Sequence, residues 1–233
     1  MVQVIGHRGV AGLEPENTLR SFQRAIDLGC DWVECDVRLT ADGYLVLMHD
    51  ETVDRTTSGM GRVDQMTFAD LRRLDAGGGE AVPTFAEFLD LIQGKVKAHV
   101  ELKGDGTEAP VLQFVEAKGA LGDVVLTSGD TQRLRRVRAR HGKVALEHIF
   151  AQPPPDAIQR AQSVKAKRIS CHCSHATAAF VEAAHRAFLE VIAWPPNTTA
   201  TMQAMIDLGV DLICTDRPDI LLTLLGRGPA AQA

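Results

Sequence analysis

The apolar and polar positions along this chain change their period many times. Short runs rich in β-branched residues alternate with stretches in which apolar residues recur every three to four positions. The first pattern is typical of buried strands and the second of amphipathic helices. Strands are predicted at Val2–Gly6, Trp32–Leu39, Tyr44–Met48, Lys97–Leu102, Val124–Thr127, Val144–His148, Arg168–Cys171, Leu189–Ala193 and Leu212–Thr215. Helices are predicted at Asn17–Leu28, Thr67–Leu74, Thr84–Ile92, 108–118, 130–140, 156–163, 174–186, 198–207 and Pro218–Leu225.

This order of elements predicts the fold class. Tyr44–Met48 follows the turn Ala41-Asp42-Gly43, so we expect it to fold back on Trp32–Leu39 as a hairpin. Without it, eight strands alternate with helices at about 29 residues per unit, which favours a TIM-like (β/α)8 barrel. The irregular stretch 51–79 is a small insertion after the second strand. A doubly wound open sheet fits less well, because no Gly-rich phosphate loop follows the first strand.

Composition limits the class of protein. The chain has 233 residues, of which 45% are hydrophobic and 24% charged, as in ordinary globular domains. We expect a single barrel over residues 1–225 and a flexible tail over 226–233. There is no run of about 18 apolar residues, so no membrane anchor is expected. The net charge of -5 argues against nucleic acid as a partner.

The cysteines and the N-terminus bear on location. The chain has five cysteines, an odd number, and its first residues lack the pattern of a signal peptide. Free thiols in a reducing cytoplasm are the simplest interpretation. Cys171-His172-Cys173 resembles part of a zinc site, but structural zinc needs four ligands and no second pair is at hand.

The polar residues stand where a barrel places its chemistry, at the C-terminal ends of strands. Because successive side chains of a strand alternate faces, Glu34 and Asp36 share one face and the intervening apolar residues share the other. The same spacing puts Glu101 and Lys103 together on the next barrel strand. The remaining candidates follow the first strand and the hairpin strand: His7, Arg8 and His49.

These residue types predict a reaction class. Carboxylates buried side by side need a cation or a shared proton, and an all-oxygen ligand set favours Mg²⁺ or Ca²⁺. Histidine is suited to acid–base catalysis, because its reference pKa of ~6.5 lies near working pH. Arg8 and Lys103 can hold a phosphate. Together the groups predict phosphoryl transfer.

A series of short motifs over residues 4 to about 219 resembles the glycerophosphodiester phosphodiesterase family. They are His7-Arg8-Gly9, Pro15-Glu16-Asn17-Thr18, Glu34-Cys35-Asp36-Val37, Thr40-Ala41-Asp42-Gly43, Val46-Leu47-Met48-His49-Asp50-Glu51, Asp54-Arg55-Thr56-Thr57 with Gly61, Pro83-Thr84, Val100-Glu101-Leu102-Lys103, Gly209-Val210-Asp211 and Thr215-Asp216-Arg217-Pro218. The order and spacing of so many motifs make the likeness specific.

The resemblance implies site residues and a substrate. It implies an acid–base pair at His7 and His49, with His7 assigned as the base, and Arg8 and Lys103 on the phosphate. Glu16 and Asn17 would line or brace the same rim. The implied substrate is a glycerophosphodiester, which gives sn-glycerol 3-phosphate and an alcohol, and a homodimer is a further expectation. The implied ligands of Mg²⁺ or Ca²⁺ are Glu34, Asp36 and Glu101.

Two segments depart from the family pattern and leave alternatives open. Thr127-Ser128-Gly129-Asp130 replaces a frequent Ser-Ser-Phe, and Trp194-Pro195-Pro196-Asn197 replaces Trp-Thr-Val-Asn, both at the expected pocket mouth. Trp194 could form the floor of a glycerol pocket or pack in the core. The alternatives to the implied activity are a phosphodiesterase or phospholipase acting on another phosphodiester and a non-catalytic phosphate-binding barrel.

Overall fold

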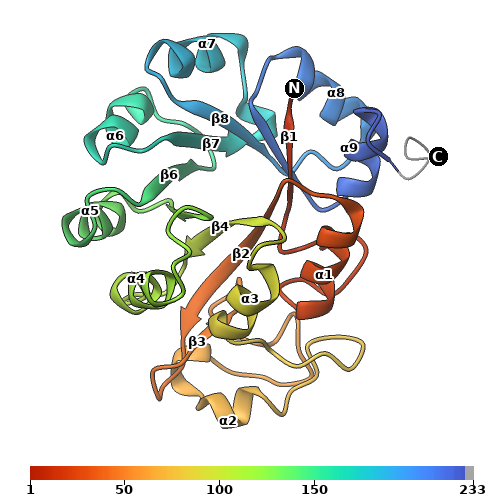
Figure 1. The fold of residues 1–233 in the computed structure, drawn as a ribbon, viewed down its shortest axis with the longest axis vertical. Coiled ribbons are helices and arrows are strands. Elements are labelled where there is room, and N and C mark those ends of the chain that lie inside the picture. The colour runs from red at the N-terminus through yellow and green to blue at the C-terminus, as the bar shows by residue number, and fades with distance from the viewer. Residues whose placement is uncertain (229–233) are drawn as a thin grey trace.

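A closed barrel of eight parallel strands forms the centre of the protein, in a computed structural model that describes residues 1–228 (Figure 1). The first and last strands pair with each other, and the first also pairs with the second, so the sheet has no free edge at this point. The predicted (β/α)8 fold is confirmed. The barrel strands are β1 (Gln3–Gly6), β2 (Trp32–Leu39), β4 (Lys97–Leu102), β5 (Val124–Ser128), β6 (Ala145–Phe150), β7 (Arg168–His172), β8 (Glu190–Trp194) and β9 (Leu212–Thr215).

Helices surround the barrel, as the ring of coils in Figure 1 shows. Thr18, Thr84 and Thr198 each cap a helix by accepting a hydrogen bond from the backbone N–H three residues on. These helices begin at or within two residues of the predicted starts. The helices are α1 (Leu19–Leu28), α3 (Phe85–Ile92), α4 (Glu108–Ala117), α5 (Thr131–Arg140), α6 (Ala157–Ser163), α7 (Ala178–Arg186), α8 (Thr199–Asp207) and α9 (Pro218–Leu224), with a short 3-10 turn, η2 (Cys173–His175), before α7.

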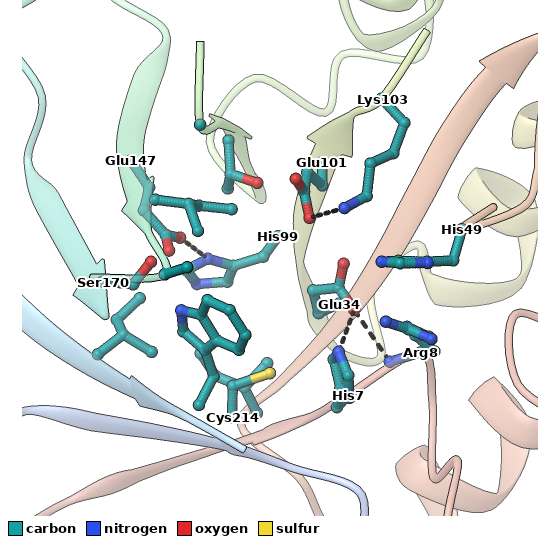
Figure 2. Close-up of a pocket in the computed structure, with 17 residues that line it drawn as sticks. His7, Arg8, Glu34, His49, His99, Glu101, Lys103, Glu147, Ser170 and Cys214 are labelled. Carbon is teal, nitrogen blue, oxygen red and sulfur yellow. Dashed lines mark hydrogen bonds and ion pairs between the residues drawn. The ribbon is translucent and has the colours of Figure 1, made fainter. Parts of the chain in front are cut away.

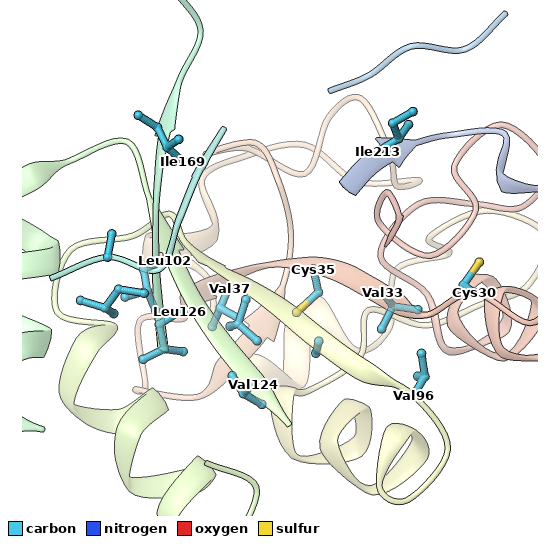
Figure 3. Packing of buried hydrophobic residues seen from close by; sticks show 14 of the residues in the cluster. Cys30, Val33, Cys35, Val37, Val96, Leu102, Val124, Leu126, Ile169 and Ile213 are labelled. Atoms are coloured by element: carbon cyan, nitrogen blue, oxygen red, sulfur yellow. The ribbon is translucent and has the colours of Figure 1, made fainter. Parts of the chain in front are cut away.

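Strand parity divides the buried residues into an outer and an inner set. Val33, Cys35 and Val37 of β2 face the helices and belong to the large core between barrel and helix ring (Figure 3). Inside the barrel a smaller apolar cluster includes Ile5 and Ile192. Polar side chains occupy the rest of the inner face, so the interior is available for a site.

The insertion forms a small unit with its own apolar core. Strand β3 (Leu45–Leu47) pairs antiparallel with β2 and confirms the hairpin. The 3-10 helix η1 (Val63–Gln65) and helix α2 (Phe68–Leu71) follow. Helix α2 is shorter than predicted, because it buries one side chain, Leu71, and Leu74 lies beyond its last turn. The insertion core is Val46, Met48, Val53, Val63, Leu71, Ala76 and Val82.

The chain is held against the barrel beyond residue 225, where the flexible tail was predicted to begin. The Arg227 guanidinium pairs with the Asp31 carboxylate and donates to the Gly29 carbonyl oxygen. Residues 229–233, the rest of the predicted tail 226–233, lie outside the described residues. Within residues 1–228, no helix is both long and apolar enough to span a membrane.

Candidate active site

A cavity of about 220 Å³ opens at the C-terminal ends of the barrel strands. Figure 2 shows two groups of polar side chains in it. His7, Arg8, Glu34, His49 and Lys103 lie on one side, and His99, Glu147 and Ser170 lie on the other.

The loop after β1 holds a strained backbone at the first side. Arg8 has a φ of 50° and Asn17 a φ of 57°, both in the left-handed region that costs a non-glycine residue about 1–3 kcal/mol. Hydrogen bonds hold this geometry: the Asn17 N–H and the Ser21 hydroxyl both donate to the Arg8 carbonyl oxygen. Gly9 (φ 86°) lies so close to Ser21 that a Cβ there would clash with it. The strain is localised at the residues that present Arg8 to the cavity.

Three carboxylates converge between β2 and β4. One oxygen each of Glu34, Asp36 and Glu101 lies within 4.8 Å of the others. Burial, and then the neighbouring Asp36, raises the pKa of Glu34 well above its usual value. Burial also raises the pKa of Glu101. The cluster therefore favours bound positive charge.

The cluster fits a hard divalent cation. Its donors are carboxylate oxygens, the ligands that Mg²⁺ and Ca²⁺ prefer. The Oδ1 atom of Asp36 is buried and accepts no hydrogen bond, and its nearest cation is Lys103 Nζ at 3.6 Å. Its other oxygen accepts from the Asn17 amide at 2.9 Å. An unpartnered carboxylate oxygen in a carboxylate cluster is an appropriate metal ligand.

Arg8 and Lys103 flank these carboxylates. Lys103 Nζ lies 2.9 Å from Glu101, and Arg8 Nε lies 3.3 Å from Asp36. Burial lowers the pKa of Lys103, but Glu101 and Asp36 outweigh it, so the net shift is upward and Lys103 stays charged. Both cations line the cavity.

Glu16 and Asn17 brace this rim and do not line the cavity. Glu16 accepts a hydrogen bond from Arg8 at 2.8 Å. The Asn17 side chain pairs with the backbone N–H and the carboxylate of Asp36. They hold the residues that reach the cavity.

A carboxylate also holds His7. Its Nδ1 lies 2.5 Å from Asp216 Oδ1, and the Asn197 amide donates to the other Asp216 oxygen. Burial raises the pKa of Asp216, but His7, Asn197 and Arg8 together outweigh it and the net shift is downward, so Asp216 is ionised. An ionised acceptor at Nδ1 keeps the proton there and leaves Nε2, which lies 4.0 Å from Glu34, free to accept one.

His49 is held in the same manner from another side. Its Nδ1 lies 2.6 Å from Asp50 Oδ1, while two guanidinium nitrogens of Arg38 donate to its carbonyl oxygen at 3.1 and 2.8 Å. Burial lowers the pKa of His49, the Asp36 and Asp50 carboxylates oppose this effect, and the net shift is downward. His49 therefore presents Nε2 to the cavity.

The opposite side of the cavity carries polar atoms without partners. Thr127 Oγ1 and Trp194 Nε1 are buried and make no hydrogen bond, and the buried Ser170 hydroxyl lies beside Glu147. Glu147 is bonded to His99 Nδ1 at 2.6 Å, and although burial raises its pKa, His99 lowers it and the net shift is downward. This side of the cavity thus presents a buried carboxylate next to hydroxyl groups. These groups can hydrogen-bond the polar parts of a ligand.

Sequence reasoning left several of these groups unassigned. No function was assigned to four of them: Asp216, Asp50, Arg38 and Glu147. Asp216 and Asp50 nevertheless stand inside recognised motifs. A signal existed for Asp216: it follows the last barrel strand, which must neighbour the first in a closed barrel and so lies next to His7. The strands of Thr127 and Ser170 gave no such signal.

Cys171 and Cys173, considered above for a zinc site, lie apart from the carboxylate cluster. Cys171 is buried in the barrel wall and Cys173 is half-buried. In the described part of the chain, the carboxylate cluster is the one group of three or more metal-binding side chains.

Fold and site together define a class, the (β/α)8-barrel proteins with a polar, charged cavity at the C-terminal ends of the strands. Residues 7–220 match the sequence model of the glycerophosphoryl diester phosphodiesterase family. The chain therefore belongs to this family, and it is an enzyme.

Individual relatives agree over nearly the whole chain. The glycerophosphodiester phosphodiesterase of Caldanaerobacter subterraneus subsp. tengcongensis is 34% identical, over 97% of this chain and 98% of the relative. That of Bacillus altitudinis is 30% identical, over 94% and 96%. A phosphodiesterase structure from Oleispira antarctica, in complex with the product sn-glycerol-3-phosphate, has a TM-score of 0.91 at 28% identity and covers 96% of both chains.

Proposed function

We propose that this enzyme hydrolyses glycerophosphodiesters to sn-glycerol 3-phosphate and an alcohol. The observation that carries the proposal is the pair of carboxylate-held histidines beside three carboxylates and two cations in one cavity. Family membership and the product complex of the Oleispira relative support the substrate class.

Arg8 and Lys103 bind the phosphodiester anion. The Arg8 guanidinium offers directed N–H donors to phosphate oxygens, and Lys103 acts as a point charge. Both lie beside the carboxylate cluster and line the same cavity as the two histidines, so a phosphodiester held by them would have its phosphorus near both rings.

The histidines move the protons. His7 Nε2 removes a proton from the attacking oxygen, while Asp216 stabilises the imidazolium that forms. His49 donates a proton to the departing alkoxide, with Asp50 on its other nitrogen. The departing group leaves as a neutral alcohol.

The carboxylates Glu34, Asp36 and Glu101 would hold Mg²⁺ or Ca²⁺. Such an ion supplies Lewis-acid polarisation of the phosphodiester.

Two nucleophiles are compatible with this arrangement. The 2-hydroxyl of the substrate's glycerol would give a cyclic phosphate that water then opens, as implied by similarity to the phosphatidylinositol-specific phospholipases. Water attacking directly is the alternative. A substrate without the 2-hydroxyl separates them: only direct attack releases alcohol from it.

The first experiment measures product and metal dependence together. Metal-stripped protein is incubated with glycerophosphocholine and glycerophosphoethanolamine, with and without Mg²⁺, Ca²⁺ or Mn²⁺, and glycerol 3-phosphate is assayed. We expect release that depends on the metal. No release with any metal would favour another phosphodiester or a phosphate-binding barrel.

Location and assembly stay predictions. The five cysteines are free thiols, four of them buried, which agrees with the expected cytoplasmic site without testing it. Size-exclusion chromatography with light scattering would test the expected homodimer.

A further inference from the structure

Arg55 lies in the insertion and connects two groups at the rim of the cavity. Its Nε donates to Asp50 Oδ2 at 2.6 Å and its Nη2 to Asp50 Oδ1 at 3.2 Å. The same guanidinium donates to both oxygens of Glu16 at 2.7 and 2.8 Å. Asp50 in turn holds Nδ1 of His49. A continuous chain of charged hydrogen bonds therefore runs from the insertion to His49. The His49 ring lines the cavity, as Figure 2 shows.

The Arg55 guanidinium, which clamps Asp50 to Glu16, fixes an Asp50 carboxylate that has few other restraints. Asp50 is about 30% exposed, and within residues 1–228 no Lys or Arg other than Arg55 pairs with it. Without Arg55, the carboxylate could rotate towards water and release the histidine ring. Glu16 is the better buried anchor, since its side chain is 16% exposed and is also bonded to Arg8.

We propose that Arg55 is a positioning residue for His49, which it orients by tying Asp50 to Glu16. The role rests on the proposed function, in which His49 protonates the departing alkoxide. Arg55 does not line the cavity and does not touch the substrate. It keeps the Asp50 carboxylate on Nδ1, so that the protonated ring, which carries a second proton on Nε2, directs that proton towards the leaving group.

A positioning role and a purely structural role predict different effects of removing Arg55 on stability and on turnover. Exposed ion pairs contribute only about 0–1 kcal/mol to stability, and the Arg55 side chain is 49% exposed. Loss of Arg55 should therefore leave the fold intact. It should slow turnover selectively for substrates whose leaving group needs a proton.

The chain offers a matched control in Arg62. This arginine also belongs to the insertion, is 42% exposed and bridges two carboxylates, Glu51 and Asp64, at 2.8–2.9 Å. Neither of these carboxylates bonds to a histidine. Arg62→Gln removes the same charge and a similar number of contacts, and leaves Asp50 clamped.

The experiment compares two leaving groups. Glycerophosphocholine releases an alkoxide that needs a proton, whereas the p-nitrophenyl diester of glycerol phosphate releases a stable phenolate. We measure kcat and KM for both with wild-type enzyme, Arg55→Gln, Arg55→Lys, Arg62→Gln and His49→Ala. Circular dichroism and thermal unfolding monitor the fold.

We expect Arg55→Gln to lower kcat on glycerophosphocholine by roughly tenfold to a hundredfold, as loss of an orienting partner does elsewhere. The loss on the nitrophenyl diester should be small, Arg55→Lys should recover part of the rate, and Arg62→Gln should match wild type. His49→Ala should show the same dependence on leaving group.

The possible contrary results separate three assignments: the role of Arg55, the role of His49 and the proposed function. The role of Arg55 is wrong if Arg55→Gln stays near wild type on both substrates. It is also wrong if His49→Ala loses more activity on glycerophosphocholine than on the nitrophenyl diester and Arg55→Gln does not. If His49→Ala loses equally on both, His49 is not the acid. If wild-type enzyme releases no glycerol 3-phosphate from either, the proposed function fails.

Discussion

His7 and His49 are oriented in the same way, each by a carboxylate from a different part of the chain. Each ring has one nitrogen on a carboxylate and the other towards the cavity, although the carboxylates come from residue 216 in one case and residue 50 in the other. The carboxylate defines the tautomer, and the tautomer defines which nitrogen can exchange a proton with substrate.

Removing either ring should remove proton transfer. We expect His7→Ala and His49→Ala each to lower kcat on glycerophosphocholine by ~10²–10⁴-fold, the usual worth of a general acid or base. The far-ultraviolet spectrum should be unchanged. Near-normal turnover by either variant would exclude the two-histidine scheme.

Removing the carboxylate behind His7 should act through the tautomer. We expect Asp216→Asn to lower kcat by up to about 10⁴-fold, as in other His–carboxylate pairs, with little change in KM. Asp219→Asn is the control, because Asp219 pairs with Arg217 and does not line the cavity. Equal activity of the two variants would refute an orienting role for Asp216.

The buried hydroxyl groups should contact the polar part of the substrate. We expect Ser170→Ala and Thr127→Val each to lower kcat/KM for glycerophosphodiesters by roughly twofold to tenfold, since each would lose a hydrogen bond worth about 0.5–1.5 kcal/mol. Bis(p-nitrophenyl) phosphate, which has no glycerol, should be cleaved as by wild type. A uniform loss on both substrates would instead indicate a packing defect.

At the scale of elements, the loop between β1 and α1 places Arg8 by means of strain. Its left-handed residues are held by hydrogen bonds to α1 and β2, including that from the Arg8 N–H to Glu34 at 3.0 Å. Rigid placement of this loop explains how one turn can supply a cation next to a carboxylate cluster.

Gly9 is the position at which this loop can be tested. We expect Gly9→Ala to lower the free energy of unfolding by about 1–3 kcal/mol for the left-handed backbone alone, with a further loss from the Cβ clash with Ser21. Gly29→Ala has a similar φ of 82° and open space, so it isolates the backbone cost. Urea unfolding measures both, and equal losses would show that the close approach to Ser21 is unimportant.

At the scale of the molecule, the barrel brings carboxylates from β2 and β4 together and cations from β1 and β4 beside them. The folded state therefore holds a concentrated negative site that the unfolded chain lacks. A ligand that binds only the folded state stabilises it by mass action.

Metal should consequently raise the unfolding temperature. At a metal concentration of one hundred times Kd, the gain is about 2.7 kcal/mol, or roughly 5–10 °C for a chain of this size. We expect Mg²⁺ or Ca²⁺ to produce this shift in metal-stripped protein, and Glu101→Gln to reduce it sharply. An unchanged midpoint in wild-type protein at millimolar metal would argue against the carboxylate site.

The sequence by itself determined the order and type of the elements, because strand and helix periods are local properties. Parity along β2 placed Glu34 and Asp36 together, and caps such as Thr84 marked where helices begin. It left Asp216 unassigned, 209 residues from His7, although the order of strands in a closed barrel makes the two neighbours. It could not place Arg55 between Glu16 and Asp50, which lie 39 and 5 residues from it, because no strand or helix period links them. Barrel closure and the packing of the insertion decided those contacts, since only the folded chain brings such distant polar groups within hydrogen-bonding distance.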